Sequence, residues 1–283
     1  MLCAPVHDGK ARSFCFYAAM TLSRVVLLLT AIVVFCGANA QNSKQNYPAV
    51  IKDSVERRAK AEREWRRMLD TYSVPQAPPD LYPITYTLRS LLGVTGGIKL
   101  VAESAGPASD PLTLRESVRG FIDRWREMIG ADSGSLSLVS VDQSDTVQRF
   151  TYKQANYAFP IAAPAGEMVA VVSNDGKLMQ LDDRLIPVVD LPLRPTIDEA
   201  TAAKRLIGRV FNYTDISGRE QRAVINNATD VSVKQLVVLV VEKADAIEVH
   251  LAWELNAGNS LKWTVYSDAV TGEDLRVVPN FQT

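Results

Sequence analysis

Few residues of this chain are of types that do chemistry. Of its two histidines, His7 lies in an N-terminal segment that resembles a leader, which leaves His250 alone in the remainder. All three cysteines, Cys3, Cys15 and Cys36, lie in the same segment. Once that segment is removed, the chain has no thiol nucleophile, no disulfide and no cysteine ligand for a metal.

His250 alternates onto the polar side of a predicted strand, which favours a solvated or hydrogen-bonded side chain over a catalytic one. The acids near it in sequence are Glu248, Glu254, Asp268, Glu273 and Asp274. A calcium site needs about six or more oxygen ligands, often from a loop of alternating acids, and that spacing is missing. The sequence therefore predicts no enzyme, no metal site and no cofactor.

The N-terminal segment has the form of a secretory signal peptide. Arg24 precedes an apolar run over residues 25–35, and the segment ends in Ala-x-Ala at Ala40. This pattern predicts cleavage after Ala40, with Met20 as an alternative start. A retained membrane helix is the alternative, but the run falls short of the about 20 residues that a bilayer needs. A lipoprotein is disfavoured because Phe35 precedes Cys36.

The signal peptide predicts that the mature chain is exported to the periplasm or to the outside of the cell. After cleavage, no membrane attachment is expected. The full sequence carries 31 Lys and Arg against 32 Asp and Glu, a net charge of −1. The leader removes more basic than acidic residues, so the remainder is slightly acidic. This balance gives no case for nucleic acid as a partner. Nothing in it indicates an oligomeric state.

Residues 41–83 are predicted to form an N-terminal helix and a linker. The helix is expected over 48–72, with a thin apolar stripe that predicts weak packing at the surface. Four prolines over 74–83 predict a stiff linker without helix or strand.

Residues 84–195 are predicted to form one α+β unit. Asp110 is a natural N-cap with Pro111 at the first helical position, and the apolar spacing predicts a helix that ends at Gly130. Alternating patterns then predict antiparallel strands, which cover 136–141, 146–154, 159–162, 168–172 and 177–181.

Residues 196–283 are predicted to form a second α+β unit, with a capped helix from Thr196 to about Phe211. Three strands follow, over 236–241, 247–255 and 261–268. A turn over 256–260 would place Trp253 opposite Trp263 on a core face, and His250 opposite Tyr266 on a solvated face. The fold class predicted for the whole chain is α+β, with helices on one side of antiparallel sheets.

Two stretches resemble a known family. Residues 150–161, followed by 169–178, resemble the fungalysin/thermolysin propeptide motif, and 251–255 with 263–273 resemble the PepSY motif that follows it in such propeptides. The positions to which this resemblance assigns a fold-determining role, rather than a catalytic one, are Gln154, Trp253, Trp263, Asp268 and Gly272.

The resemblance implies a non-enzymatic module that inhibits a metallopeptidase and assists its folding. This chain contains no His-Glu-x-x-His sequence, so the expected partner is a separate secreted thermolysin-like peptidase, bound in trans. Binding would use the sheet and the C-terminal tail, with Val277, Val278 and Phe281 as interface residues. A frayed terminus is the alternative for the tail. An extracytoplasmic binding or scaffolding role unrelated to peptidases, and an unrecognised enzyme, also remain open.

Overall fold

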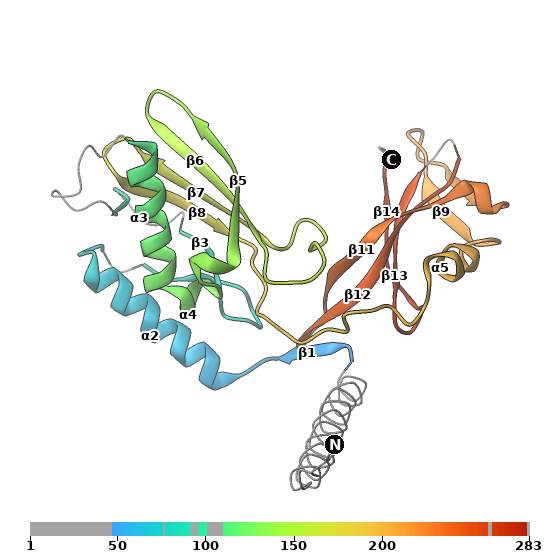
Figure 1. Cartoon of the computed structure of the whole chain (residues 1–283), viewed down its shortest axis with the longest axis horizontal. Helices are drawn as coiled ribbons and strands as arrows, with labels where there is room; N and C mark the ends of the chain where they lie inside the picture. The colour runs from blue at the N-terminus through green and yellow to red at the C-terminus, as the bar shows by residue number, and fades with distance from the viewer. Residues whose placement is uncertain (1–46, 76, 92–95, 101–109, 260–261, 282–283) are drawn as a thin grey trace, which may run out of the picture. The chain divides into compact units, whose positions relative to one another are not determined.

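The computed structural model describes residues 47–75, 77–91, 96–100, 110–259 and 262–281 (Figure 1). The predicted signal peptide and its cleavage site lie outside these residues. Helices and mostly antiparallel sheets make up the described chain, which confirms the α+β class. Two sheets hold most of its strands. We call them the first sheet and the second sheet, in the order of their main strands along the chain.

The first sheet is antiparallel and has the strand order β2-β3-β8-β7-β6-β5, with β4 also paired to β8. Its strands are β2 (Asp80–Leu81), β3 (Leu88–Ser90), β4 (Ile98–Lys99), β5 (Leu136–Gln143), β6 (Val147–Gln154), β7 (Glu167–Ser173) and β8 (Lys177–Asp183). The four longer strands match four of the five predicted ones, whereas residues 159–162 form only an isolated bridge from Ile161 to Val238. The short strand β2 lies inside the segment predicted to be a linker without strand.

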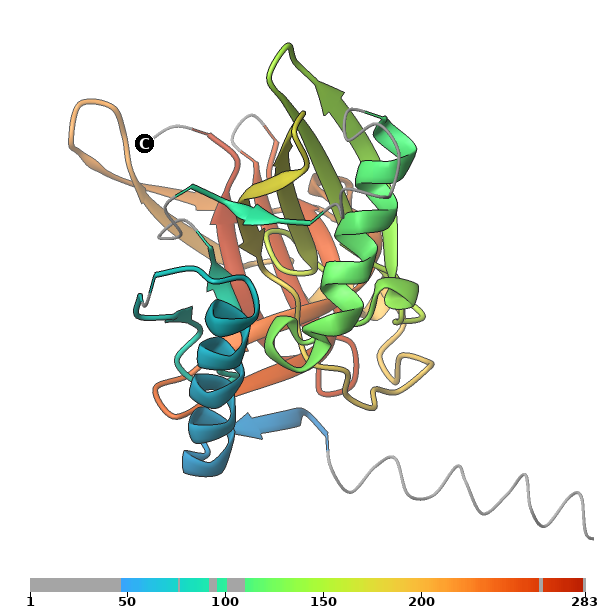
Figure 2. The same cartoon turned by 90° about the vertical axis from the view of Figure 1, so that its left-hand side faces the viewer.

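Three helices pack on one face of the first sheet and share a core with it (Figure 2). They are α2 (Val55–Thr71), α3 (Pro111–Arg124) and α4 (Arg126–Ile129). Asp110 caps α3 as predicted, because its carboxylate accepts a hydrogen bond from the Thr113 N–H at 2.9 Å. Gly130 ends α4 with a positive φ of 88°, a conformation that glycine adopts without strain.

The prediction that the N-terminal helix packs only weakly was wrong. Trp65, Met68 and Leu69 of α2 are buried in the same core as Phe121 of α3 and Phe150 of β6. The few large apolar residues of this helix lie on one side near its C-terminal end. They are therefore buried together, although the apolar stripe of the helix is thin. The helix also begins later than predicted, at an N-cap formed by Ser54.

One acid lies in this core. Asp183 is fully buried at the end of β8, in the same cross-strand row as Tyr152 and Met168. One of its oxygens accepts a hydrogen bond from the Leu185 N–H at 2.8 Å, and the other has no partner among the described residues. Burial raises the pKa of this carboxyl group well above its usual range.

We therefore expect Asp183→Asn to remove a pH dependence of stability. Because the folded pKa is raised, stability relative to the variant is greatest below the unfolded pKa of about 3.9, and it falls as the pH rises toward the folded pKa. Urea titrations at pH 4 and pH 8 should show that the free energy of unfolding of the variant increases relative to that of the wild type as the pH rises. Asp182→Asn, at the adjacent half-buried position, serves as the control. Equal pH profiles for wild type and Asp183→Asn would contradict the expectation.

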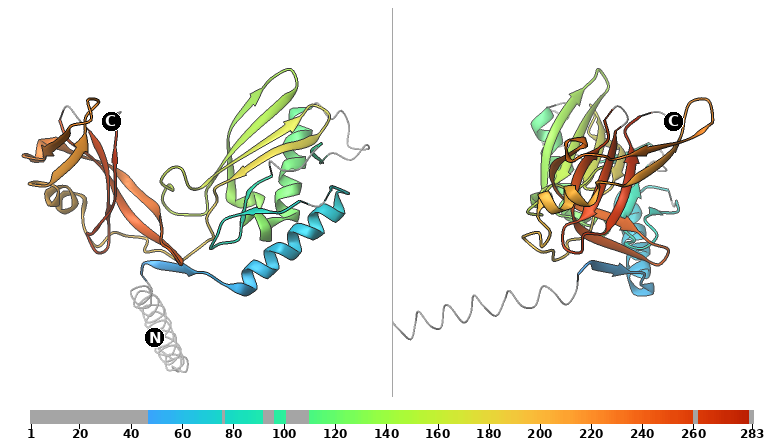
Figure 3. Two further views of the ribbon diagram at one scale, coloured as in Figure 1. Left: turned by 180° about the vertical axis from the view of Figure 1, so that it is seen from behind. Right: turned by 90° about the vertical axis from the view of Figure 1, so that its right-hand side faces the viewer.

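The second sheet has the order β1-β12-β13-β14, and β11 pairs with the other side of β12. Its strands are β1 (Ala49–Lys52), β11 (Val231–Glu242), β12 (Ala246–Ala257), β13 (Trp263–Asp268) and β14 (Asp274–Pro279). Sequence patterns predicted the middle three, although β11 is longer than expected. The strands β1 and β14 were missed, since residues 48–52 were assigned to a helix and 276–283 to a tail. Figure 3 shows β1 beside the start of β12, just before the chain enters α2.

The register predicted for the β12–β13 hairpin was wrong by an even number of residues. Trp263 lies opposite Ala257 and Trp253 lies opposite Ser267. The strand β12 continues to Ala257 and β13 begins only at Trp263, so the turn lies later in the chain than predicted and the pairing shifts by four residues. Because side chains alternate with a period of two, an even shift leaves each tryptophan on its predicted face.

The helix of the C-terminal half is shorter than predicted. Asp198 is its N-cap, and α5 (Glu199–Arg205) ends before the strands β9 (Val210–Thr214) and β10 (Glu220–Val224), which form a separate hairpin. Buried residues of α5 and β9 pack on one face of the second sheet, around Leu255 and Trp263. Two short 3-10 turns, Ser133–Ser135 and Ala228–Asp230, complete the described elements.

Candidate functional site

Asp268 organises the turn between β13 and β14. One carboxylate oxygen accepts hydrogen bonds from the N–H groups of Val270 at 2.7 Å and Thr271 at 2.9 Å. The other oxygen lies 2.7 Å from Nδ1 of His250. Gly272 closes the turn with a positive φ of 78°, which disfavours any other residue there. Asp268 and Gly272 thus lie together in one turn. Both are positions to which the sequence resemblance assigned a fold-determining role.

His250 is buried, so the prediction of a solvated face was wrong, whereas its contact with Asp268 agrees with the alternative of a hydrogen-bonded side chain. It is 5% exposed, and its Nε2 lies 3.2 Å from a Glu248 oxygen. The face that carries it is covered because Ala162, from the loop after β6, packs on Ala252 and Tyr266 of the second sheet. Glu254 is also buried on this face and is paired with Lys234 at 2.8 Å.

The two tryptophans differ in burial. Trp263 is 3% exposed and stacks on Phe211, with ring centroids 5.0 Å apart. Phe281 meets Trp263 edge-on at 5.1 Å and also contacts Tyr213. Trp253 is half-buried, and its indole N–H donates to the Ile197 carbonyl at 2.8 Å. Phe281, predicted to lie at an interface, is therefore a member of this ring cluster.

The predicted tail is mostly the strand β14, which forms the outer edge of the second sheet. Val277 and Val278 lie on it and are 41% and 39% exposed. The Asn280 N–H donates to the Lys262 carbonyl, so the alternation of the ladder points the backbone of Val278 toward β13 and that of Val277 away. Pro279 also points away and has no N–H, so little of this edge is open for pairing.

Gln154 is buried and holds the connector that follows β8. Its side chain donates to the Ile186 carbonyl at 2.8 Å and accepts from the Ile186 N–H at 3.1 Å. The Tyr157 hydroxyl donates to the next carbonyl, that of Pro187, at 2.8 Å. These bonds fix the conformation of the connector where it passes the second sheet. The sequence singled out Gln154, but not the surface that it positions.

That connector forms one wall of a pocket of about 480 Å³. The opposite wall is the end of β11 with the start of β12, and the loop after β6 and the start of β14 complete the lining. Most lining side chains are apolar: Ala162, Pro164, Ala165, Leu185, Ile186, Pro187, Val240, Val241, Ile247 and Leu275. A concave, mostly apolar pocket with a few polar groups is the usual form of a binding site.

Among the described residues, no strand pairs with the outer edge of β11 at this pocket. Val238 pairs with Ile161 of the loop after β6, since the Val238 N–H donates to the Pro160 carbonyl and the Val238 carbonyl accepts from the Ala162 N–H. The Lys243 N–H donates to β12. The backbone groups of even-numbered residues from Val238 onward therefore point away from β12.

Val240 and Glu242 continue this outward-facing edge beyond Val238, and both line the pocket. The loop segment that pairs with Val238 leaves the edge after Ala162. The pocket thus begins where the chain's own added segment stops. It presents an unoccupied stretch of strand edge together with apolar walls.

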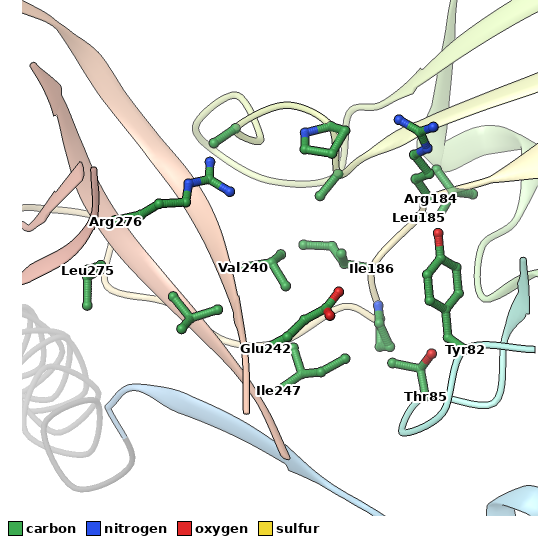
Figure 4. A pocket seen from close by; sticks show the side chains of 15 residues that line it. Tyr82, Thr85, Arg184, Leu185, Ile186, Val240, Glu242, Ile247, Leu275 and Arg276 are labelled. Atoms are coloured by element: carbon green, nitrogen blue, oxygen red, sulfur yellow. The ribbon is translucent and has the colours of Figure 1, made fainter. Parts of the chain in front are cut away.

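Three charged side chains line the pocket (Figure 4). Arg184 and Arg276 lie on opposite sides, and Glu242 projects from the end of β11. Burial, followed by the negative charge of Asp183, raises the pKa of Tyr82. Its phenol therefore stays protonated and donates to the Asp183 carbonyl at 2.8 Å.

The described part of the chain contains no group of three or more His, Cys, Asp and Glu side chains placed to hold a metal ion. Within the same residues, no helix is long and apolar enough to cross a membrane. The residues that line the pocket were not predicted. They come from segments far apart in sequence, and no local spacing marks them.

Neither a protein-family model nor a curated protein matches the chain. Among solved structures, the chain is similar to one described as the Bacillus megaterium YpeB C-terminal domain, at 14% sequence identity and a TM-score of 0.31. That match covers 82% of this chain and 99% of the other. Similarity at this level does not establish a family, so the likeness to propeptides stays a prediction.

Proposed function

We propose that the chain is an exported, non-catalytic module that binds an extended segment of another protein at the open edge of β11. The observation that supports this is the pocket in which the outward backbone of Val240 and Glu242 faces apolar walls. An extended segment gains affinity from backbone hydrogen bonds to a strand edge, and specificity from pockets for alternate side chains.

The fold already uses this mode of pairing. The segment around Ile161 adds to β11 at Val238, with hydrogen bonds of 2.8 and 2.9 Å. A segment of a partner placed beyond it would extend the same pairing to Val240. The open edge of β14 is shorter because of Pro279, so the β11 edge is the better site for strand addition.

The partner that we propose first is a secreted thermolysin-like peptidase, which this chain would inhibit or help to fold. The support is the sequence resemblance to PepSY-containing propeptides, carried by Trp253, Asp268 and Gly272. A partner unrelated to peptidases is the alternative, and the same pocket would serve it.

We expect Ala165→Phe to abolish binding by filling the pocket. Ala165 is half-buried in the pocket wall, and an aromatic ring there would occupy the space of a ligand side chain. The test is a titration of the exported protein against a thermolysin-like peptidase from the same source, which follows peptidase activity and complex formation. The variant should bind at least about tenfold more weakly, equivalent to about 1.4 kcal/mol.

Ala155→Phe is the matched control, because Ala155 lies on the same loop after β6 but is exposed and does not line the pocket. If wild type and Ala165→Phe bind the peptidase equally, the pocket is not the site. If the wild type does not bind, the peptidase is removed as a partner. Capture from the exporting cell's own periplasm and medium, with Ala165→Phe as the negative control, then tests the alternative.

A further inference from the structure

We infer that the segment bound at the β11 edge carries a carboxylate, recognised by Arg276 at one end of the pocket. The inference rests on the proposed function and adds the chemistry of the ligand. The carboxylate would belong either to the C-terminus of the bound segment or to an acidic side chain within it. Arg276, Arg184 and Glu242 are the charged side chains that line the pocket.

The Arg276 side chain is held in place but its charge is not neutralised. Its guanidinium lies over the Tyr266 ring, 4.5 Å from the centroid, and one N–H reaches the Ala163 carbonyl at a long 3.4 Å. Its Nε is buried without a hydrogen-bond partner among the described residues. No described carboxylate lies within ion-pair distance of this side chain.

An arginine fixed in this way suits the recognition of an anion. A guanidinium carries five N–H donors in a rigid plane that matches a carboxylate, and among the described residues a single weak hydrogen bond, to the Ala163 carbonyl, uses them. Stacking on Tyr266 reduces the side-chain entropy that would otherwise be lost on binding. The apolar walls exclude water, and this strengthens a charge-assisted hydrogen bond.

Arg184, on the opposite side of the pocket, adds a second positive charge. Glu242 sets the orientation of the ligand. Its carboxylate projects from the end of β11, so a ligand carboxylate placed near it would be repelled. The anionic group therefore belongs at the Arg276 end, and the apolar side chains along Val240 and Ile186.

The test uses the exported protein and three pools of random seven-residue acetylated peptides. One pool has a free C-terminus and no acidic residue, the second has an amidated C-terminus and one glutamate, and the third has an amidated C-terminus and no acid. Peptides retained by the immobilised protein are quantified by mass spectrometry. We expect retention of the first or the second pool, which identifies the source of the carboxylate, about tenfold or more above the third.

Arg276→Met keeps the aliphatic stem and should bring the retained pool down to the level of the third. Arg276→Lys should recover part of the loss, because it restores the charge but not the planar donor set. Glu242→Gln should increase retention a few-fold, an effect that general damage to the fold would not produce. Arg149→Met, at an exposed position on β6, should behave as the wild type.

Two outcomes are distinguishable. If the wild type retains peptides of all three pools equally and Arg276→Met does not change this, the carboxylate inference is overturned and the proposed function stands. If the wild type retains none of the pools above a blank surface, while Ala165→Phe behaves identically, strand addition at this pocket is overturned and the inference fails with it.

Discussion

Replacement of Trp263 by alanine is expected to lower the free energy of unfolding by about 3 to 5 kcal/mol, the usual cost of a large-to-small change in a core. The indole is 3% exposed and touches three other rings, those of Phe211, Tyr213 and Phe281. Its removal would leave a cavity between β9, β13 and the end of the chain. Denaturant titration, followed by circular dichroism, measures the loss.

Trp253→Ala is the matched comparison and should cost less. This indole lies on the same face but is half-buried, and it contributes one hydrogen bond to the Ile197 carbonyl. Trp263→Phe should recover part of the loss, since a smaller ring can still pack against Phe211. An equal or larger cost for Trp253→Ala would contradict the difference in burial.

Asp268→Ala is expected to cost a similar amount, about 3 to 5 kcal/mol, because removal of one member of a buried polar network leaves the others unsatisfied. The carboxylate serves the N–H groups of Val270 and Thr271 and the ring of His250 at once. The turn would lose two of its hydrogen bonds, and a buried imidazole would lose its partner on β13.

The double variant His250→Ala with Asp268→Ala measures how strongly the two side chains interact, apart from the effect of each substitution alone. If the two side chains act together, the double variant should cost less than the two single variants combined. Asp268→Asn retains an oxygen for the two backbone donors and should be milder than alanine. Simple additivity of the two single costs would show that His250 and Asp268 do not interact energetically.

The faces of the second sheet were predictable, whereas its register was not. Alternation in β12 and β13 identified the side of Trp253 and Trp263, and an even shift in pairing preserved it. The position of the turn decides the register, and the sequence around Gly258 allows more than one. Ala162, from the loop after β6, packs on the face of the second sheet that carries His250, and a pattern within β12 does not reveal this contact.

The pocket could not be predicted from local patterns. Gln154 carried a signal, because a glutamine at an inward position of a strand needs a partner. Its partner is the backbone of Ile186, a residue in a proline-rich connector that shows no periodicity. The open backbone of Val240 is invisible in sequence, because it depends on where the loop at Ile161 leaves the edge of β11.

The strand β1 has a consequence for the order in which the chain can fold. Ala49 pairs with Val249, near the opposite end of the described chain. A chain that emerges N-terminus first, from a ribosome or from an export channel, therefore presents β1 long before its partner. Contacts between residues so distant in sequence raise the contact order and slow folding. The pairing of β1 can form only after β12 has emerged, whereas the first sheet, built mostly from neighbouring strands, can form earlier.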